Sequence, residues 1–170
     1  MDMAVFTDLL VRFVGGRPPL PFLVLLVFHV LTGLTCVVSG AAAALSAKRP
    51  GRHPTFGTIY YWALLVVFLS STAMALLRWL RDYELFVLGA IAFAAATVGY
   101  LARRIRWAGW TVYHISGMGM SYIVLLTAFY VDNGPKLPLW DHLPAAAFWI
   151  LPTLVGLPLV AAALVRHLKQ

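Results

Sequence analysis

Charged residues are scarce in this sequence. Only 11% of its 170 residues are Asp, Glu, Lys or Arg, whereas 62% are hydrophobic. Soluble domains average about 25% charged residues, so this composition argues against a soluble protein. The net charge of +7 does not indicate nucleic-acid binding, because the basic residues fall in short segments between apolar runs. In that position they set the orientation of membrane helices.

Cysteine is scarce too, and carboxylates are missing from the apolar runs. Cys36 is the single cysteine, which excludes an internal disulfide, a CxxC redox pair and a thiolate cluster within one chain. The lack of Asp and Glu inside the runs argues against a transporter that uses intramembrane carboxylates and against a magnesium–phosphate site. The serines of these runs have no acid nearby to complete a triad, so the sequence offers no catalytic residue.

Long apolar runs dominate what is present. Four stretches of at least 20 residues contain no Asp, Glu, Lys or Arg, and a fifth falls just short. Each can cross a hydrocarbon core about 30 Å thick as a helix, the only form in which a single segment satisfies its own backbone in lipid. We therefore predict an all-α integral membrane bundle forming a single domain over residues 1–170. Its five transmembrane helices are expected at about residues 20–46, 57–77, 85–101, 111–131 and 143–165.

A short amphipathic helix is expected before the first span. Within residues 1–17, four apolar side chains and two charged ones would lie on opposite sides of a helix: Phe6, Leu9, Leu10 and Phe13 against Asp8 and Arg12. This pattern is typical of a helix that lies at the membrane surface.

Small residues recur at helical spacing in two spans. The first span carries His29, Gly33, Cys36, Gly40 and Ala43 along one stripe, and the third carries Gly89, Ala92, Ala96 and Gly99. Small side chains let helices approach closely in lipid, so we expect both stripes to be packing faces.

Aromatic residues and prolines mark two further features. The start of the second span carries Tyr60, Tyr61 and Trp62, which we expect to form an interfacial belt. In the last span, Pro152 and Pro158 are expected to kink the helix.

The basic residues predict an orientation. With five spans, one side of the membrane holds eight Lys and Arg and no acid: Lys48, Arg49, Arg52, Arg103, Arg104, Arg106, Arg166 and Lys169. The other side holds five basic residues and all six acids. Because cytoplasmic loops are enriched in Lys and Arg, we expect the N-terminus outside and the C-terminus in the cytoplasm.

Histidines are the residues best suited to chemistry. An ionisable residue within a membrane span is a functional hypothesis by default, and the alternative is a neutral imidazole that donates to a neighbouring helix. Counting about 1.5 Å per residue puts His29 about 7 Å outside the midplane and His114 about 10 Å inside it. At about 17 Å apart in depth, the two are too far apart to ligate the iron of one upright haem.

Depth favours two other pairs: His114 with His53 near the cytoplasmic face, and His29 with His142 in the outer half. Two imidazoles can ligate haem iron or, with further ligands, a transition metal. We expect His53 and His114 to hold a cofactor or metal at an inner site, with His29 and His142 at an outer one. Met118, one turn above His114, could add a thioether, although methionine in an apolar helix more often only packs.

Two resemblances rest on these histidines. The segments His29-x3-Gly33-x6-Gly40 and His53-x3-Gly57-x-Ile59-Tyr60, joined by a basic loop, resemble a domain-of-unknown-function family of small predicted bacterial multi-pass membrane proteins. The likeness covers the first two spans and, more loosely, the fourth span with His114. It implies a membrane fold in the bacterial cytoplasmic (inner) membrane and carries no agreed activity. The order of the histidines also looks like that of small b-type cytochrome bundles, by pattern of ligands only.

The leading hypothesis is a membrane protein that binds haem b for electron transfer or haem handling, with a quinone or a redox protein as partner in the bilayer. One alternative is a small transporter or channel in which His29 and His114 relay protons or metal ions. Another is a non-enzymatic assembly subunit whose small-residue stripes dock a partner or a second copy of the chain. No nucleic-acid partner is expected.

Overall fold

The computed structural model describes residues 20–77, 79–138, 140 and 142–169, and it shows an all-α bundle. Its elements are α2 (Leu20–Leu45), α3 (Arg52–Leu77), α4 (Trp79–Ile105), α5 (Trp110–Asn133), the 3-10 turn η1 (Gly134–Lys136) and α6 (Ala145–Leu168). Five of these helices are long and apolar enough to cross a membrane, which confirms the predicted count. The amphipathic helix predicted over residues 1–17 lies outside the described residues.

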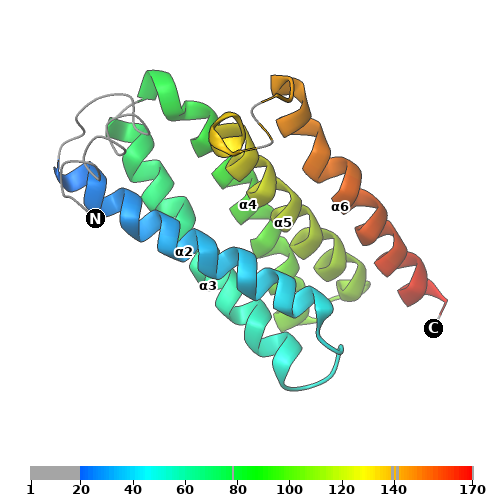
Figure 1. Cartoon of the computed structure of the whole chain (residues 1–170). Helices are drawn as coiled ribbons and strands as arrows, with labels where there is room; N and C mark the ends of the chain where they lie inside the picture. The colour runs from blue at the N-terminus through cyan, green and yellow to red at the C-terminus, as the bar shows by residue number, and fades with distance from the viewer. Residues whose placement is uncertain (1–19, 78, 139, 141, 170) are drawn as a thin grey trace.

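The helices run alternately up and down (Figure 1). The loop between α2 and α3, the loop between α4 and α5 and the end of α6 lie at one end of the bundle. We call it the basic end, because it carries Lys48, Arg49, Arg52, Arg103, Arg104, Arg106, Arg166 and Lys169. The start of α2, the junction of α3 with α4, and η1 lie at the opposite end.

Packing follows the order of the chain. Each helix packs against the next one, and α2 also touches α5. Four helices, α2 to α5, therefore enclose the core, while α6 lies against α5 on the outside (Figure 1). The core is a cluster of buried residues from all four: Cys36, Tyr60, Leu64, Val67, Ala92, Ala96 and Leu125.

The stripe on α4 and most of the stripe on α2 lie on packing faces, whereas a Cβ at Gly33 would meet nothing within 4 Å. Ala92 and Ala96 are buried in the core, and Gly99 lies against the backbone of Met118 on α5. A Cβ at Gly117 would lie 2.7 Å from the Gly99 nitrogen, so these two glycines bring α4 and α5 into backbone contact. On α2, Gly40 lies under the ring of Tyr122.

The starts of two helices differ from the sequence-based expectation. α3 begins at Arg52 rather than near residue 57, with Pro54 in the first turn, where its missing N–H removes no helical hydrogen bond. α4 begins at Trp79 rather than near residue 85, so its first turns include Asp82 and Glu84. α6 runs as one helix through Pro152 and Pro158, a pattern that membrane helices tolerate when neighbouring groups satisfy the freed carbonyls. The kink expected in this helix stays a prediction.

Large apolar side chains cover the outer surface. On α2 the exposed ones include Val24, Val27, Leu31, Leu34 and Val38, and on α6 they include Ile150, Leu154, Val155 and Leu159. Leu154 and Leu159 are 62% and 67% exposed. In water such continuous faces would drive aggregation, whereas in a bilayer they are the surfaces that contact lipid.

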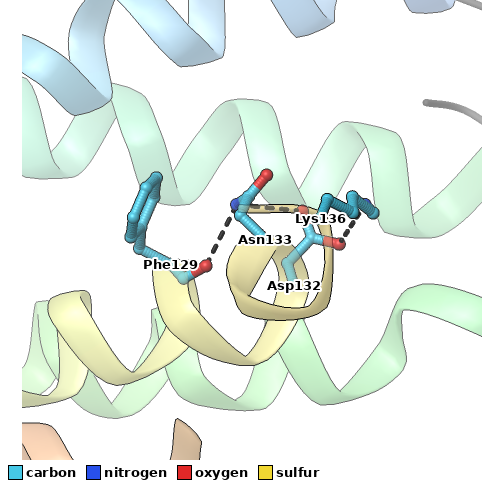
Figure 2. A network of polar contacts seen from close by, with 4 residues as sticks. All are labelled: Phe129, Asp132, Asn133 and Lys136. Carbon is cyan, nitrogen blue, oxygen red and sulfur yellow. Dashed lines mark hydrogen bonds and ion pairs between the residues drawn. The ribbon is translucent and has the colours of Figure 1, made fainter. Parts of the chain in front are cut away.

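A small polar network closes α5 at the opposite end (Figure 2). The Asn133 amide donates to the Phe129 carbonyl at 3.0 Å, and Lys136 pairs with Asp132 at 3.5 Å. Both charged side chains are well exposed, so this pair contributes about 0–1 kcal/mol at most. The network places the acid and its cation together at the end away from the basic loops.

The glycine contact between α4 and α5 gives a test of the fold. Gly117→Ala is expected to destabilise the protein by about 1–3 kcal/mol, because the new Cβ would meet the Ala95 carbonyl at 2.6 Å. Gly33→Ala is the matched control, since a Cβ there meets nothing within 4 Å and helix propensity should add up to about 1 kcal/mol. Unfolding of both variants in mixed detergent micelles measures the difference. Equal stability of the two would contradict the close helix approach.

Candidate functional site

The rings of His53 and His114 meet at the basic end. Their centroids are 6.0 Å apart and their planes are nearly perpendicular, at 88°. His53 lies in the first turn of α3 and His114 near the start of α5, so the two side chains face each other between the α2–α3 and α4–α5 hairpins. The structure thus brings together the two residues that depth counting paired.

The position of His53 follows from the end of α2. The last carbonyls of a helix have no partner within it, and the Ala43 carbonyl lies 2.8 Å from His53 Nδ1. Lys48 donates from Nζ to the Ala43 and Ala44 carbonyls at 3.1 and 2.7 Å. Burial lowers the pKa of Lys48 from its ordinary value. His53 and Lys48 therefore cap α2 together.

The position of His114 follows from the close approach of α4 and α5. Its Nδ1 lies 2.9 Å from the Gly99 carbonyl. Gly99 and Gly117 bring the two backbones together, which puts this carbonyl within reach of the ring. The indole of Trp110, one turn earlier, lies 6.3 Å from the His114 ring.

These bonds select one tautomer at both histidines. A carbonyl oxygen only accepts, so each Nδ1 must carry the hydrogen and donate it. In the neutral imidazole the lone pair then sits on Nε2, and we find no hydrogen bond to Nε2 of His53 or His114 among the described residues. Histidines that ligate metals through one nitrogen usually donate the other N–H in this way, often to a backbone carbonyl.

The spacing of the pair also suits a shared ligand. The ring centres are 6.0 Å apart, so both imidazoles lie near enough to contact one ligand. Only two ligands converge here: no group of three or more His, Cys, Asp or Glu that could hold a metal occurs among the residues described. The donor set therefore suits a metal that brings further ligands of its own.

The surroundings of the pair are positively charged. Lys48 and Arg103 lie within electrostatic range of both rings, and the described acidic side chains, Glu84 and Asp132, lie on helix turns at the opposite end. A bare divalent cation would be repelled here. A ligand with negative charge of its own would be attracted.

Met118 lies one turn from His114 but is part of the core. Its side chain packs against the buried cluster and lies close to Gly99. The structure shows it as packing, and a thioether ligand at this position stays a prediction.

His29 occupies a separate place in the fold. Its Nδ1 lies 2.9 Å from the Ser70 hydroxyl, which itself donates to the carbonyls of Val66 and Val67. Ser70 comes seventeen residues after His53 on α3, about 25 Å away along the helix. His142 is exposed just before α6. The structure gives His29 a serine as partner, and its pairing with His142 stays a prediction.

A buried polar group lies between these two places. Tyr60 donates to the Ser121 hydroxyl at 2.9 Å, and Ser121 in turn donates to the Met118 carbonyl at 2.8 Å. Tyr122 donates to the Val37 carbonyl at 3.0 Å. Each of these series of hydrogen bonds ends on a backbone carbonyl, as the one from His29 through Ser70 does. They therefore do not form a continuous hydrogen-bonded path along the bundle.

Tyr60 was wrongly expected in an interfacial belt. It is only 2% exposed and joins α3 to α5 through Ser121, whereas Trp62 is 54% exposed, as a belt residue would be. Tyr60 lies two turns after His53, on the same face of α3. That spacing was the signal that could have placed it in the core.

Comparison of the chain with models of protein families, with curated proteins and with solved structures found no match. The resemblances drawn from the histidine segments therefore stay expectations, and the functional argument rests on the geometry of the site.

The tautomers are directly measurable. Nitrogen-15 NMR of histidine-labelled protein in micelles at mildly alkaline pH is expected to show the Nδ1–H form at His29, His53 and His114, because each Nδ1 faces an acceptor. Single His→Gln variants assign the signals, and the exposed His142 serves as the internal reference. An Nε2–H signal from His53 or His114 would contradict the hydrogen bonds that define the site.

Proposed function

We propose that this chain is a membrane protein that binds b-type haem at its basic end, with His53 and His114 as axial ligands. Haem would serve electron transfer or haem handling. The observation that carries the proposal is the facing pair of imidazoles. Each is anchored through Nδ1 to a backbone carbonyl, and neither Nε2 has a hydrogen bond among the described residues.

The donor set and the charge both fit haem. Two histidine nitrogens are a common axial pair for haem iron, and the porphyrin supplies the four remaining ligands that the protein lacks. Haem also carries negative propionates, which suit a site within range of Lys48 and Arg103. When bound, haem supplies a one-electron iron couple, which a quinone or a redox protein in the membrane could use.

The packing around the pair supports access by a ligand. α3 and α5 meet through side chains, His53 with His114 and Tyr60 with Ser121. At the basic end a ligand therefore has to displace rings and loop residues, not packed backbones. The Gly99–Gly117 contact holds α4 against α5 independently of the contacts between α3 and α5.

One observation favours a second candidate, a non-enzymatic assembly subunit. His53 already caps α2, and His29 and His114 already bridge neighbouring helices, so all three imidazoles have a structural role. In that case the histidines only hold helices together. By contrast, the hydrogen-bond chains that end on backbone carbonyls give no support to a proton relay from His29 to His114.

Absorption spectroscopy separates the two candidates. Protein purified in mild detergent and supplied with haem is expected to show a Soret band and a low-spin, bis-histidine spectrum. His53→Ala and His114→Ala should each abolish the low-spin form, because one axial ligand is lost. His142→Ala and His167→Ala are the controls, since both residues lie outside the pair, and they should retain it. If no Soret band appears after haem is added, the haem proposal is wrong and the assembly subunit is the remaining candidate.

We also propose that the protein resides in a bacterial cytoplasmic membrane, with its N-terminus outside and its C-terminus in the cytoplasm. The support is the collection of eight Lys and Arg at one end of the bundle, because positive charge is retained on the cytoplasmic side. The site would then face the cytoplasmic half of the bilayer.

The orientation predicts the behaviour of fusions. A fluorescent protein that folds only in the cytoplasm should be bright when fused to the C-terminus, and alkaline phosphatase fused there should be inactive. Fusions after Asn133, at the opposite end, should show the reverse. Active phosphatase at the C-terminus would overturn the orientation while leaving the helix count untouched.

A further inference from the structure

A depression opens beside α4 at the basic end, apart from the histidine pair. It has a volume of about 360 Å³ and is lined by Thr58 of α3 and by Tyr100, Arg103, Arg104 and Arg106. Thr58 lies five residues after His53, on a different face of α3. The histidines point between the hairpins, whereas the depression lies along α3 and α4.

Aromatic rings hold two of the three arginines. The guanidinium of Arg104 lies 5.9 Å from the centre of the Tyr100 ring. The Tyr100 ring also stacks on the Tyr61 ring, with parallel planes and centroids 4.1 Å apart. The guanidinium of Arg106 lies 5.8 Å from the centre of the Trp110 ring. Both arginines thus make cation–π contacts, which do not use their N–H donors, so these donors can still bind an anion.

The backbone at Arg106 indicates that its side chain matters. Arg106 ends α4 with a φ of 57°, the left-handed conformation that glycine normally supplies after a helix. Among the described non-glycine residues it is the one with positive φ. Backbone strain of this kind is concentrated at functional sites, and Arg106 lines the depression.

Among the described residues, no carboxylate pairs with the three guanidiniums. In the part of the chain that the structure describes, the ion pair found is Lys136 with Asp132, at the opposite end. Arginine binds phosphate through paired, charge-assisted hydrogen bonds, and basic pockets next to membrane helices are typical of sites for anionic lipid headgroups. Tyr100 adds a hydroxyl that can donate to a remaining oxygen. The Thr58 hydroxyl already donates to the Pro54 carbonyl at 2.9 Å, so Thr58 only lines the depression.

We propose that this depression binds a phosphate group, that of an anionic phospholipid headgroup, between α3 and α4 at the membrane surface. The same chemistry would accept free phosphate, so the two sources must be separated by experiment. Arg103 lines the depression and also lies within electrostatic range of the histidine rings. The proposal still does not depend on haem binding, because its test changes Arg104 and Arg106 and uses a different readout.

The test is the thermal stability of the full chain in phosphatidylcholine-containing micelles, followed by tryptophan fluorescence. Adding phosphatidylglycerol is expected to raise Tm by about 5 °C, and inorganic phosphate at the same concentration should give little change. The double variant Arg104→Gln, Arg106→Gly should lose most of the shift. Its matched control is Arg49→Gln, Arg166→Gln, which removes the same charge from the same end outside the depression and should keep the shift.

Each outcome decides the proposal. A shift with inorganic phosphate equal to that with phosphatidylglycerol supports the phosphate site and assigns it to phosphate in solution. No shift with either probe overturns the proposal, and so does an equal loss in the control variant, which would show that only the general positive charge attracts the lipid. If the double variant fails to fold, Arg106→Gly alone decides, because glycine suits the left-handed backbone at that position.

Discussion

The contact between Gly99 and Gly117 is the constraint on which the rest depends. Lipid offers no hydrophobic drive for helices to associate, so close van der Waals packing and hydrogen bonds must hold the bundle. Backbone contact at these glycines brings α4 and α5 together and puts the Gly99 carbonyl within reach of His114. The same helices carry the core alanines and the Tyr60–Ser121 bond. The position of the His114 ring therefore depends on the lack of side chains at Gly99 and Gly117.

Polar groups in the bundle obey one rule. A hydroxyl or imidazole in lipid must place its hydrogen on an acceptor, and nearly every available acceptor is a backbone carbonyl. Tyr122, Ser121 and Ser70 all follow it. At the histidine pair the rule uses up the N–H groups and leaves two basic nitrogens at one end of the protein. In each ring, Nδ1 thus holds the histidine in the structure, and Nε2 is the atom that can bind a ligand.

The sequence predicted the coarse fold well and the site in part. Uninterrupted apolar runs and small-residue stripes are strong signals, and they gave the five helices and their packing faces. Depth counting paired His53 with His114, because rise per residue is the same in every helix. Tyr60 was wrongly expected at the membrane surface. It is close in sequence to the exposed Trp62, but its side chain lies on a different face of the helix and is buried. The carbonyls that orient the rings were beyond prediction, because backbone acceptors carry no signature in a sequence.

The Ala43 carbonyl has a consequence for motion at the pair. It accepts from Lys48 as well as from His53, so the ring can leave without stranding a buried acceptor, which would cost about 1–3 kcal/mol. The Gly99 carbonyl lies within α4 and has a helical N–H partner besides His114. Both imidazoles can therefore swing out and back at the cost of a single hydrogen bond each. The Ala43 and Gly99 carbonyls thus keep a hydrogen bond whether the histidine ring is in or out.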